Sequence, residues 1–186
     1  MTTPIDIMKP LYKWKSVRWE KCLALYELAS QCDNAIVELG SYDGNGTIAL
    51  ALGAKRPYQV YGIDQYKRSS GIYHQEFYAS DEQDLHTNAA KCNVQINTVK
   101  ADAIQAAKNW NNGPVSLVVW DISLPNRMPD DFLAWTEHIE PGGLYLMKDN
   151  HKWELGWKDL INALSNNWKI DYMKYEACLW GVRKIK

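Results

Sequence analysis

The chain has 186 residues, the length of one ordinary domain, so we expect a single domain over residues 1–186. Apolar residues make up 46% of the sequence and charged residues 23%, a mixture that excludes a disordered chain. The net charge of −1 lacks the basic excess typical of nucleic-acid binding, so nucleic acid is not an expected partner.

The N-terminal residues contain no apolar signal segment, and no apolar run approaches the ~20 residues of a membrane span. We therefore expect a cytoplasmic protein without membrane contact. The four cysteines are not spaced as metal ligands and are typical of buried, reduced thiols: Cys22, Cys32, Cys92 and Cys178.

Residues 1–34 are expected to form a helical preamble to a core over residues 35–186. Apolar side chains in this preamble recur near one face at helical spacing, with lysines and glutamates between them. They are Leu11, Trp14, Cys22, Leu25, Tyr26 and Ala29.

The core alternates apolar runs with helical segments. Short apolar runs bounded by turn residues predict buried strands at residues 35–37, 60–63, 94–99, 115–120 and 144–148. Helices are predicted at residues 47–54, 81–92 and 104–109, from Pro129 onward, and around residues 157–164. Residues 65–80 predict a loop, Pro141-Gly142-Gly143 a turn, and residues 170–175 and 178–183 a terminal hairpin.

This order of elements predicts an α/β fold. We expect a Rossmann-like, doubly wound sheet that is mostly parallel, ends in a C-terminal antiparallel hairpin and carries helices on both faces. Right-handed crossovers bring the carboxyl ends of the parallel strands to one edge of the sheet. Ligands of such sheets bind outside that edge, near the point where the strand order reverses.

Acidic residues stand at or just past the carboxyl ends of the predicted strands: Glu38, Asp64, Asp102, Asp121 and Asp149. A single acid in such a place could cap the next helix. Five acids along one edge form an acidic rim, which would suit hydroxyl groups, an amine or a metal ion.

The segment from Glu38 to Thr47 is rich in glycine, which permits positive φ and a close approach of a ligand to the backbone. Its glycines follow the pattern G-x-x-x-G-x-G rather than the G-x-G-x-x-G of dinucleotide-binding sheets. It also lacks the lysine of a phosphate-binding P-loop. The alternative is that these glycines only form a sharp turn from strand to helix.

The run VELGSYDGNGTIALA resembles motif I of the class I S-adenosylmethionine-dependent methyltransferases. VYGID, VKADA and PGGLYLMKDN resemble later segments of that family in the same order, so the resemblance spans about residues 35–150. It implies S-adenosylmethionine as the cofactor. The cofactor-binding residues that it implies are Glu38, Gly40, Ser41, Tyr42, Gly44, Thr47, Asp64, Gln65, Asp102, Ala103 and Asp121.

The resemblance also implies a role for the main members of this set. Gly40 and Gly44 would border the methionine portion, with Glu38 fixing the loop or the amine. Asp64 would accept hydrogen bonds from the ribose hydroxyls, while Asp102 and Ala103 would lie at the adenine. Tyr66 could flank the adenine ring.

A metal site is a further expectation. Asp121, Asp149 and Asn150 offer the oxygen ligands that Mg²⁺ prefers, and their spacing resembles the metal site of catechol-type O-methyltransferases. Those enzymes carry a basic residue three positions after the first metal acid, where this chain has Leu124. The chain also resembles a related bacterial group that methylates hydroxyls of sugars and polyketides, but it lacks the second acid and the histidine which that group carries in the same turn.

The general base is therefore sought elsewhere in the sequence. His151, which follows Asn150, is the expected catalytic base, since histidine can take up a proton at neutral pH. His74 and Lys148 are weaker candidates.

Together these features predict an S-adenosylmethionine-dependent methyltransferase that acts on a hydroxyl of a small molecule, with help from Mg²⁺ if the metal site is real. The alternatives are a nicotinamide-dependent oxidoreductase, a non-catalytic cofactor-binding module and a nucleic-acid methyltransferase. Aromatic residues, if exposed, would support a homodimer.

Overall fold

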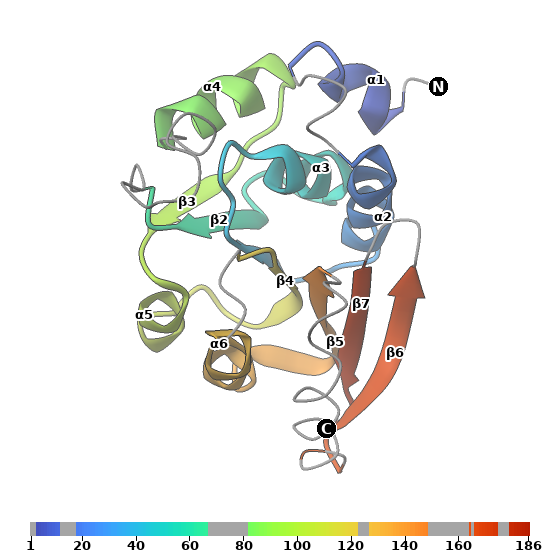
Figure 1. The fold of residues 1–186 in the computed structure, drawn as a ribbon, viewed down its shortest axis with the longest axis vertical. Coiled ribbons are helices and arrows are strands. Elements are labelled where there is room, and N and C mark those ends of the chain that lie inside the picture. Colours follow the sequence, from blue (N-terminus) through green and yellow to red (C-terminus); the bar gives the residue numbers. More distant parts are fainter. Residues whose placement is uncertain are drawn as a thin grey trace.

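The computed structural model describes residues 3–11, 18–66, 82–122, 127–148, 164, 166–174 and 179–186. In this part of the chain, seven strands form one sheet. They are β1 (Ala35–Leu39), β2 (Val60–Asp64), β3 (Asn97–Lys100), β4 (Val115–Trp120), β5 (Ile139–Lys148), β6 (Trp168–Lys174) and β7 (Leu179–Lys184). Their order across the sheet is β3-β2-β1-β4-β5-β7-β6 (Figure 1).

The first five strands are parallel, and of the last two only β7 runs in the opposite direction. β1 pairs in parallel with β2 on one side and with β4 on the other. β7 runs antiparallel to both β5 and β6, which confirms the predicted C-terminal hairpin. The chain leaves β1 toward β3 and returns to start β4 on the other side of β1. The strand order therefore reverses between β1 and β4, where a sheet of this kind binds its ligands.

Helices cover both faces of the sheet, as predicted (Figure 1). One face carries α1 (Pro4–Met8), α2 (Trp19–Ala29), α3 (Asn45–Gly53) and α4 (Glu82–Lys91). The other carries α5 (Ala103–Lys108) and α6 (Met128–Trp135). None of the helices in the described part of the chain is long and apolar enough to cross a membrane.

Strand alternation divides the core into two apolar clusters. Ile36 and Leu117 point toward α2 and α3, whereas their neighbours Val37 and Val118 point toward α5 and α6. Because both faces are buried, the parallel strands are apolar throughout, which explains why they appear in the sequence as unbroken runs. The same alternation decides which face each acid at a strand end occupies.

Most predicted elements are confirmed, and α3, α4 and α5 lie within two residues of their predicted bounds. The third strand begins at Asn97 rather than at residue 94, because Val94 still bonds through its N–H to Ala89 O at the end of α4. The three buried cysteines Cys22, Cys32 and Cys92 are free thiols, as expected, and Cys178 lies outside the described residues.

One further expectation differs from the structure. The turn Pro141-Gly142-Gly143 lies inside β5 and not before it. The register with β4 jumps from Val115 opposite Ile139 to Leu117 opposite Leu144, so the intervening residues form a bulge. The predicted helical preamble is confirmed, with α1 and α2 in its described residues. Trp14 and most of the predicted helix around residues 157–164 lie outside the described residues.

Candidate functional site

The glycine loop lies between the end of β1 and the start of α3, at the point where the strand order reverses. Gly40 has φ +89° and donates its N–H to Ile63 O at 2.8 Å. A Cβ at Gly40 would lie 2.8 Å from the carbonyl oxygen of Asp121, so the loop packs directly against the end of β4. Only glycine satisfies both the backbone angle and this close approach.

The carboxyl group of Glu38 lies beneath the glycine loop, in the core, and contacts the residues that begin α3. Its side chain is 1% exposed and accepts a hydrogen bond from the hydroxyl of the equally buried Thr47. A Cβ at Gly46 would overlap this carboxyl group, so the first turn of α3 rests on it. Burial raises the pKa of Glu38 to about 7, although Lys21 opposes the shift. Of the two roles implied for Glu38, this position fits the fixing of the loop.

Gly44 begins α3 as its N-cap, with φ +95°. Its N–H bonds to Ser41 O at 2.9 Å, which closes the turn between them. A Cβ there would overlap the side chain of Leu85, so α4 packs over this point of the loop. Each of the three loop glycines therefore avoids a different clash. Together they allow the loop backbone to pack against Asp121, Leu85 and Glu38.

Asp64 joins the glycine loop to the loop that follows β2. One of its carboxylate oxygens accepts the N–H of Tyr42 and the other the N–H of Tyr66, each at 3.1 Å. Both tyrosines adopt positive φ, 48° and 46°, which turns their N–H groups toward this carboxylate. An ionised carboxylate offers about four acceptor positions, so Asp64 keeps acceptor capacity for further donors such as hydroxyl groups.

Ser41 and Tyr66 form a second link between the same loops. Their hydroxyl groups are 2.9 Å apart, and Tyr66 also donates to Gly62 O at 3.3 Å. Tyr66 is only 6% exposed, and its burial raises the pKa of its hydroxyl. Its ring therefore belongs to the apolar core beneath the loops and leaves little surface for the adenine ring that it was expected to flank.

Asp102 begins α5 and accepts the N–H of Ile104 at 3.0 Å as an N-cap. Gln65 donates to the same carboxylate at 3.2 Å, which brings two residues of the expected cofactor set together. Arg127, which the sequence analysis did not select, forms an ion pair with Asp102 and another with the buried Asp131. The Arg127 guanidinium lowers the pKa of Asp102. Ala103 follows in the first turn of α5 and is buried.

Asp121, at the end of β4, forms an ion pair with Lys21 of α2. The side chains of the two residues are 7% and 15% exposed, so the pair is largely buried. Lys21 was not predicted as a site residue. Its signal in the sequence is its spacing, because it precedes the buried Ala24 and Leu25 by three and four positions. Burial lowers the pKa of the Lys21 ammonium, but the negative charges of Asp121 and Glu38 outweigh this effect and raise that pKa above its ordinary value.

The predicted base His151 and the predicted metal ligands Asp149 and Asn150 lie outside the described residues, as do His74 and Leu124. Within the described ranges, no group of three or more His, Cys, Asp or Glu residues is placed to hold a metal ion. Asp121 is the one described member of the expected Mg²⁺ ligand set. It does not fit a metal ligand in this arrangement, because the ammonium of Lys21 is already bound to its carboxylate.

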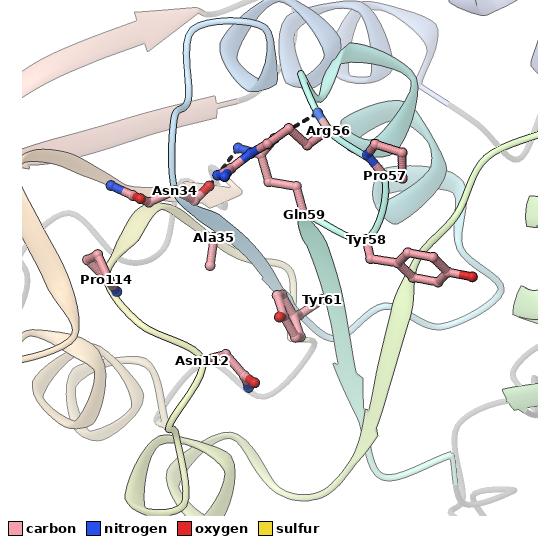
Figure 2. Close-up of a pocket in the computed structure, with 9 residues that line it drawn as sticks. All are labelled: Asn34, Ala35, Arg56, Pro57, Tyr58, Gln59, Tyr61, Asn112 and Pro114. Atoms are coloured by element: carbon pink, nitrogen blue, oxygen red, sulfur yellow. Dashed lines mark hydrogen bonds between the residues drawn. The ribbon is translucent and has the colours of Figure 1, made fainter.

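A hollow of about 320 Å³ lies at the opposite edge of the sheet, where the strands begin (Figure 2). The Gln59 side chain that lines it is already used in hydrogen bonds within the fold, because its amide donates to Cys32 O at 3.1 Å and to Asn34 O at 2.7 Å. The ring of Tyr58 points away from Asn34 and Ala35 (Figure 2). None of the expected cofactor residues lines this hollow. We therefore place the candidate site at the glycine-loop edge.

Comparisons with known proteins identify the family and the fold. Residues 37–150 match the family model of a methyltransferase domain. Similar solved structures include the O-methyltransferase NovP, with a TM-score of 0.71 and 9% identity over 90% of this chain and 80% of that chain. An O-methyltransferase from Bacillus cereus in complex with SAH has a TM-score of 0.64 and 14% identity over 99% and 91% of the two chains.

Another similar structure is a putative rRNA methylase from Clostridium thermocellum, with a TM-score of 0.65 and 13% identity over 87% and 93% of the two chains. At such identities the likeness shows the fold alone, and it confirms the Rossmann-like prediction. No curated protein matches the sequence.

Proposed function

The chain belongs to the methyltransferase-domain family, and from this we propose that it transfers the methyl group of S-adenosylmethionine to a hydroxyl group of a small molecule. The observation that carries the proposal is the pair of joined loops at the carboxyl edge of the sheet. Asp64 binds one backbone N–H from each loop and keeps acceptor capacity. Such a carboxylate suits the two neighbouring hydroxyls of a ribose.

The neighbouring residues would hold the remaining parts of the cofactor. The first turn of α3 has backbone N–H groups without helical partners. The Asp43 carboxylate accepts the N–H of Asn45, and the others would favour an anionic group such as the carboxylate of the methionine portion. Gly40 and Gly44 keep the loop backbone close to that point. Asp102, already bonded to Gln65, would lie at the adenine with Ala103 beside it.

When bound, S-adenosylmethionine supplies a methyl group on a positively charged sulfur, which needs no acid to leave as a neutral thioether. The chain's own residues therefore contribute mainly through positioning. Asp64 and Asp102 would fix the nucleoside end, and the loop from Glu38 to Thr47 would fix the amino-acid end. His151 stays the predicted base that takes the proton of the acceptor hydroxyl.

The proposed acceptor is a small molecule and not RNA, although one of the similar structures is a putative rRNA methylase. The net charge of −1 supports this choice, because RNA binding requires many cationic contacts to phosphate. A fluorescence titration with RNA at two salt concentrations tests it. Binding that weakens steeply with salt would move the proposal to a nucleic-acid acceptor.

The cofactor is tested by calorimetric titration of the purified chain with S-adenosylmethionine and, separately, with NAD. We expect saturable binding of S-adenosylmethionine that Asp64→Ala weakens at least about tenfold, the value of one charge-assisted hydrogen bond. Asp33→Ala is the matched control, because Asp33 is an exposed acid that pairs with Lys55 at the other edge. Binding of NAD in place of S-adenosylmethionine would overturn the proposal in favour of an oxidoreductase.

A further inference from the structure

The ion pair between Lys21 and Asp121 stands apart from the surface pairs of this molecule. Lys55 and Asp33, for comparison, have side chains that are 44% and 81% exposed. Lys21 and Asp121 are at 7% and 15%, so water and salt screen their attraction far less. A buried pair of this kind gives little net stability, because removing both charges from water costs about as much as their attraction returns. Stability alone is thus a poor explanation for a lysine at this place.

The fold explains how Lys21 reaches the ligand edge of the sheet. Alternation along β1 and β4 turns Glu38 and Asp121 toward the face that carries α2 and α3. α2 packs closely beside α3, since a Cβ at Gly53 would overlap the backbone carbonyl of Tyr26. Lys21 is the third residue of α2, and its side chain extends from there to the carboxylate of Asp121.

We propose that Lys21 is a built-in counter-ion for Asp121 that takes the place of a divalent metal at the carboxyl end of β4. The sequence predicts Asp121 as a metal ligand, and the structure gives this carboxylate an ammonium instead. A divalent ion needs several oxygen ligands and is repelled by a cation beside it. Lys21 and a metal ion therefore exclude each other at Asp121.

The proposal rests on the proposed methyl transfer where it concerns the acceptor. A divalent metal can bind two adjacent oxygens of one acceptor at once, which selects catechols and vicinal diols. A lysine ammonium carries one charge and donates single hydrogen bonds to one acceptor atom each. The acceptor of this enzyme then needs only one hydroxyl oxygen, and methyl transfer continues after metal ions have been removed.

The test is a titration of the full chain with Mn²⁺, followed by the loss of the electron paramagnetic resonance signal of the free ion. The variants are Lys21→Met, which keeps the aliphatic length without the charge, Lys21→Arg, which keeps the charge, and Asp121→Asn. We expect no saturable binding by the wild type or by Lys21→Arg. Lys21→Met should bind Mn²⁺ saturably, at least about tenfold more tightly than the weakest binding that the titration can detect, because a repelling unit charge has been removed.

The double variant with Lys21→Met and Asp121→Asn should lose the gained Mn²⁺ binding. A folded Lys21→Met chain that gains no Mn²⁺ binding overturns the proposal. If Lys21→Met does not fold, the wild type decides the question: saturable Mn²⁺ binding that Asp121→Asn abolishes overturns the proposal, and its absence supports it.

A failure of this inference can be told apart from a failure of the proposed function. Calorimetry with S-adenosylmethionine measures cofactor binding without reference to metal. A chain that binds S-adenosylmethionine and also binds Mn²⁺ at Asp121 contradicts only the role of Lys21. A chain that binds neither S-adenosylmethionine nor Mn²⁺ contradicts the proposed function, whereas its lack of Mn²⁺ binding still supports the role of Lys21.

Discussion

At the scale of single residues, Glu38 gives the candidate site a pH dependence. Its pKa rises from 4.5 to about 7, chiefly because the side chain is buried. The folded chain then binds a proton more tightly than the unfolded chain between these two values. Stability must therefore fall as the pH rises from about 4.5 to 7, with the loss complete above the folded pKa.

Glu38→Gln should remove this part of the pH dependence, because an amide keeps the shape of the protonated acid and does not titrate. Urea unfolding of the wild type and the variant at intervals between pH 4.5 and 7.5 measures the two slopes. Glu20→Gln, at an exposed side chain in the first turn of α2, is the control and should keep the wild-type slope. Equal slopes for the wild type and Glu38→Gln would show that Glu38 titrates at its ordinary pKa.

Gly40 allows a second comparison of single residues. Gly40→Ala places an alanine at φ +89° with its Cβ 2.8 Å from Asp121 O. Gly113→Ala imposes almost the same angle, φ +83°, where nothing lies within 4 Å of the new Cβ. Both should lose about 1–2 kcal/mol of unfolding free energy from the left-handed backbone. Gly40→Ala should lose a further ~1–3 kcal/mol from overpacking, as measured by urea unfolding.

Residues of the site differ in how far the sequence could predict them. Glu38, Asp64 and the loop glycines were predictable, because acids after apolar runs and glycines before a helix have a local cause. The spacing of Lys21 places it on the buried side of its helix, but its role was not predictable, because a lysine on an amphipathic helix is usually exposed and the distant Asp121 is what makes its burial tolerable. Partners that are 100 residues apart leave no local pattern.

At the scale of elements, Arg127 connects α6 to α5. Its guanidinium binds Asp102 at the start of α5 and Asp131 within α6, and Asp131 also accepts the indole N–H of Trp120 at 3.0 Å. Asp131 is fully buried, so the loss of Arg127 would leave a buried carboxylate with one neutral donor. The two helices that cover this face therefore depend on one cation for their charge balance.

We expect Arg127→Met to lower the unfolding free energy by about 2–4 kcal/mol, somewhat less than the loss of a partner from a fully buried pair, because Arg127 is 27% exposed. Lys55→Met, which breaks an exposed pair, should cost less than about 1 kcal/mol. Guanidinium chloride would screen these charges, so urea unfolding is the measurement. Similar losses in the two variants would mean that Arg127 acts as an ordinary surface residue.

The elements themselves were largely predictable, and their exceptions have physical causes. Buried parallel strands and capped helices leave local signals, as Asp102 shows by capping α5. The glycine turn in β5 was misplaced, because a bulge and a turn use the same residues and only pairing with β4 distinguishes them. The register jump there depends on residues far away in the sequence.

At the scale of the whole molecule, the cofactor would connect parts of the chain that the sheet holds side by side. The loops after β1 and β2 and the start of α5 come from separate segments, and Asp64 and Asp102 join them in pairs. A ligand that contacts all three binds the folded chain and not the unfolded one. Its binding free energy is then added to the stability of the entire domain.

This linkage gives a prediction for thermal unfolding. S-adenosylmethionine at 100 times its Kd should add about 2.7 kcal/mol of stability. For a chain of this size the gain corresponds to a rise in Tm of roughly 5–10 °C, measured by scanning calorimetry. Asp64→Ala at the same ligand concentration should show a smaller rise, because its Kd is higher. Gly113→Ala, whose new Cβ would meet no atom within 4 Å, should show the full rise above its own lower Tm. The rise in Tm depends on the Kd of the cofactor and not on where it binds. If Asp64→Ala shows the same rise as the wild type, the cofactor therefore binds away from the loops that Asp64 joins.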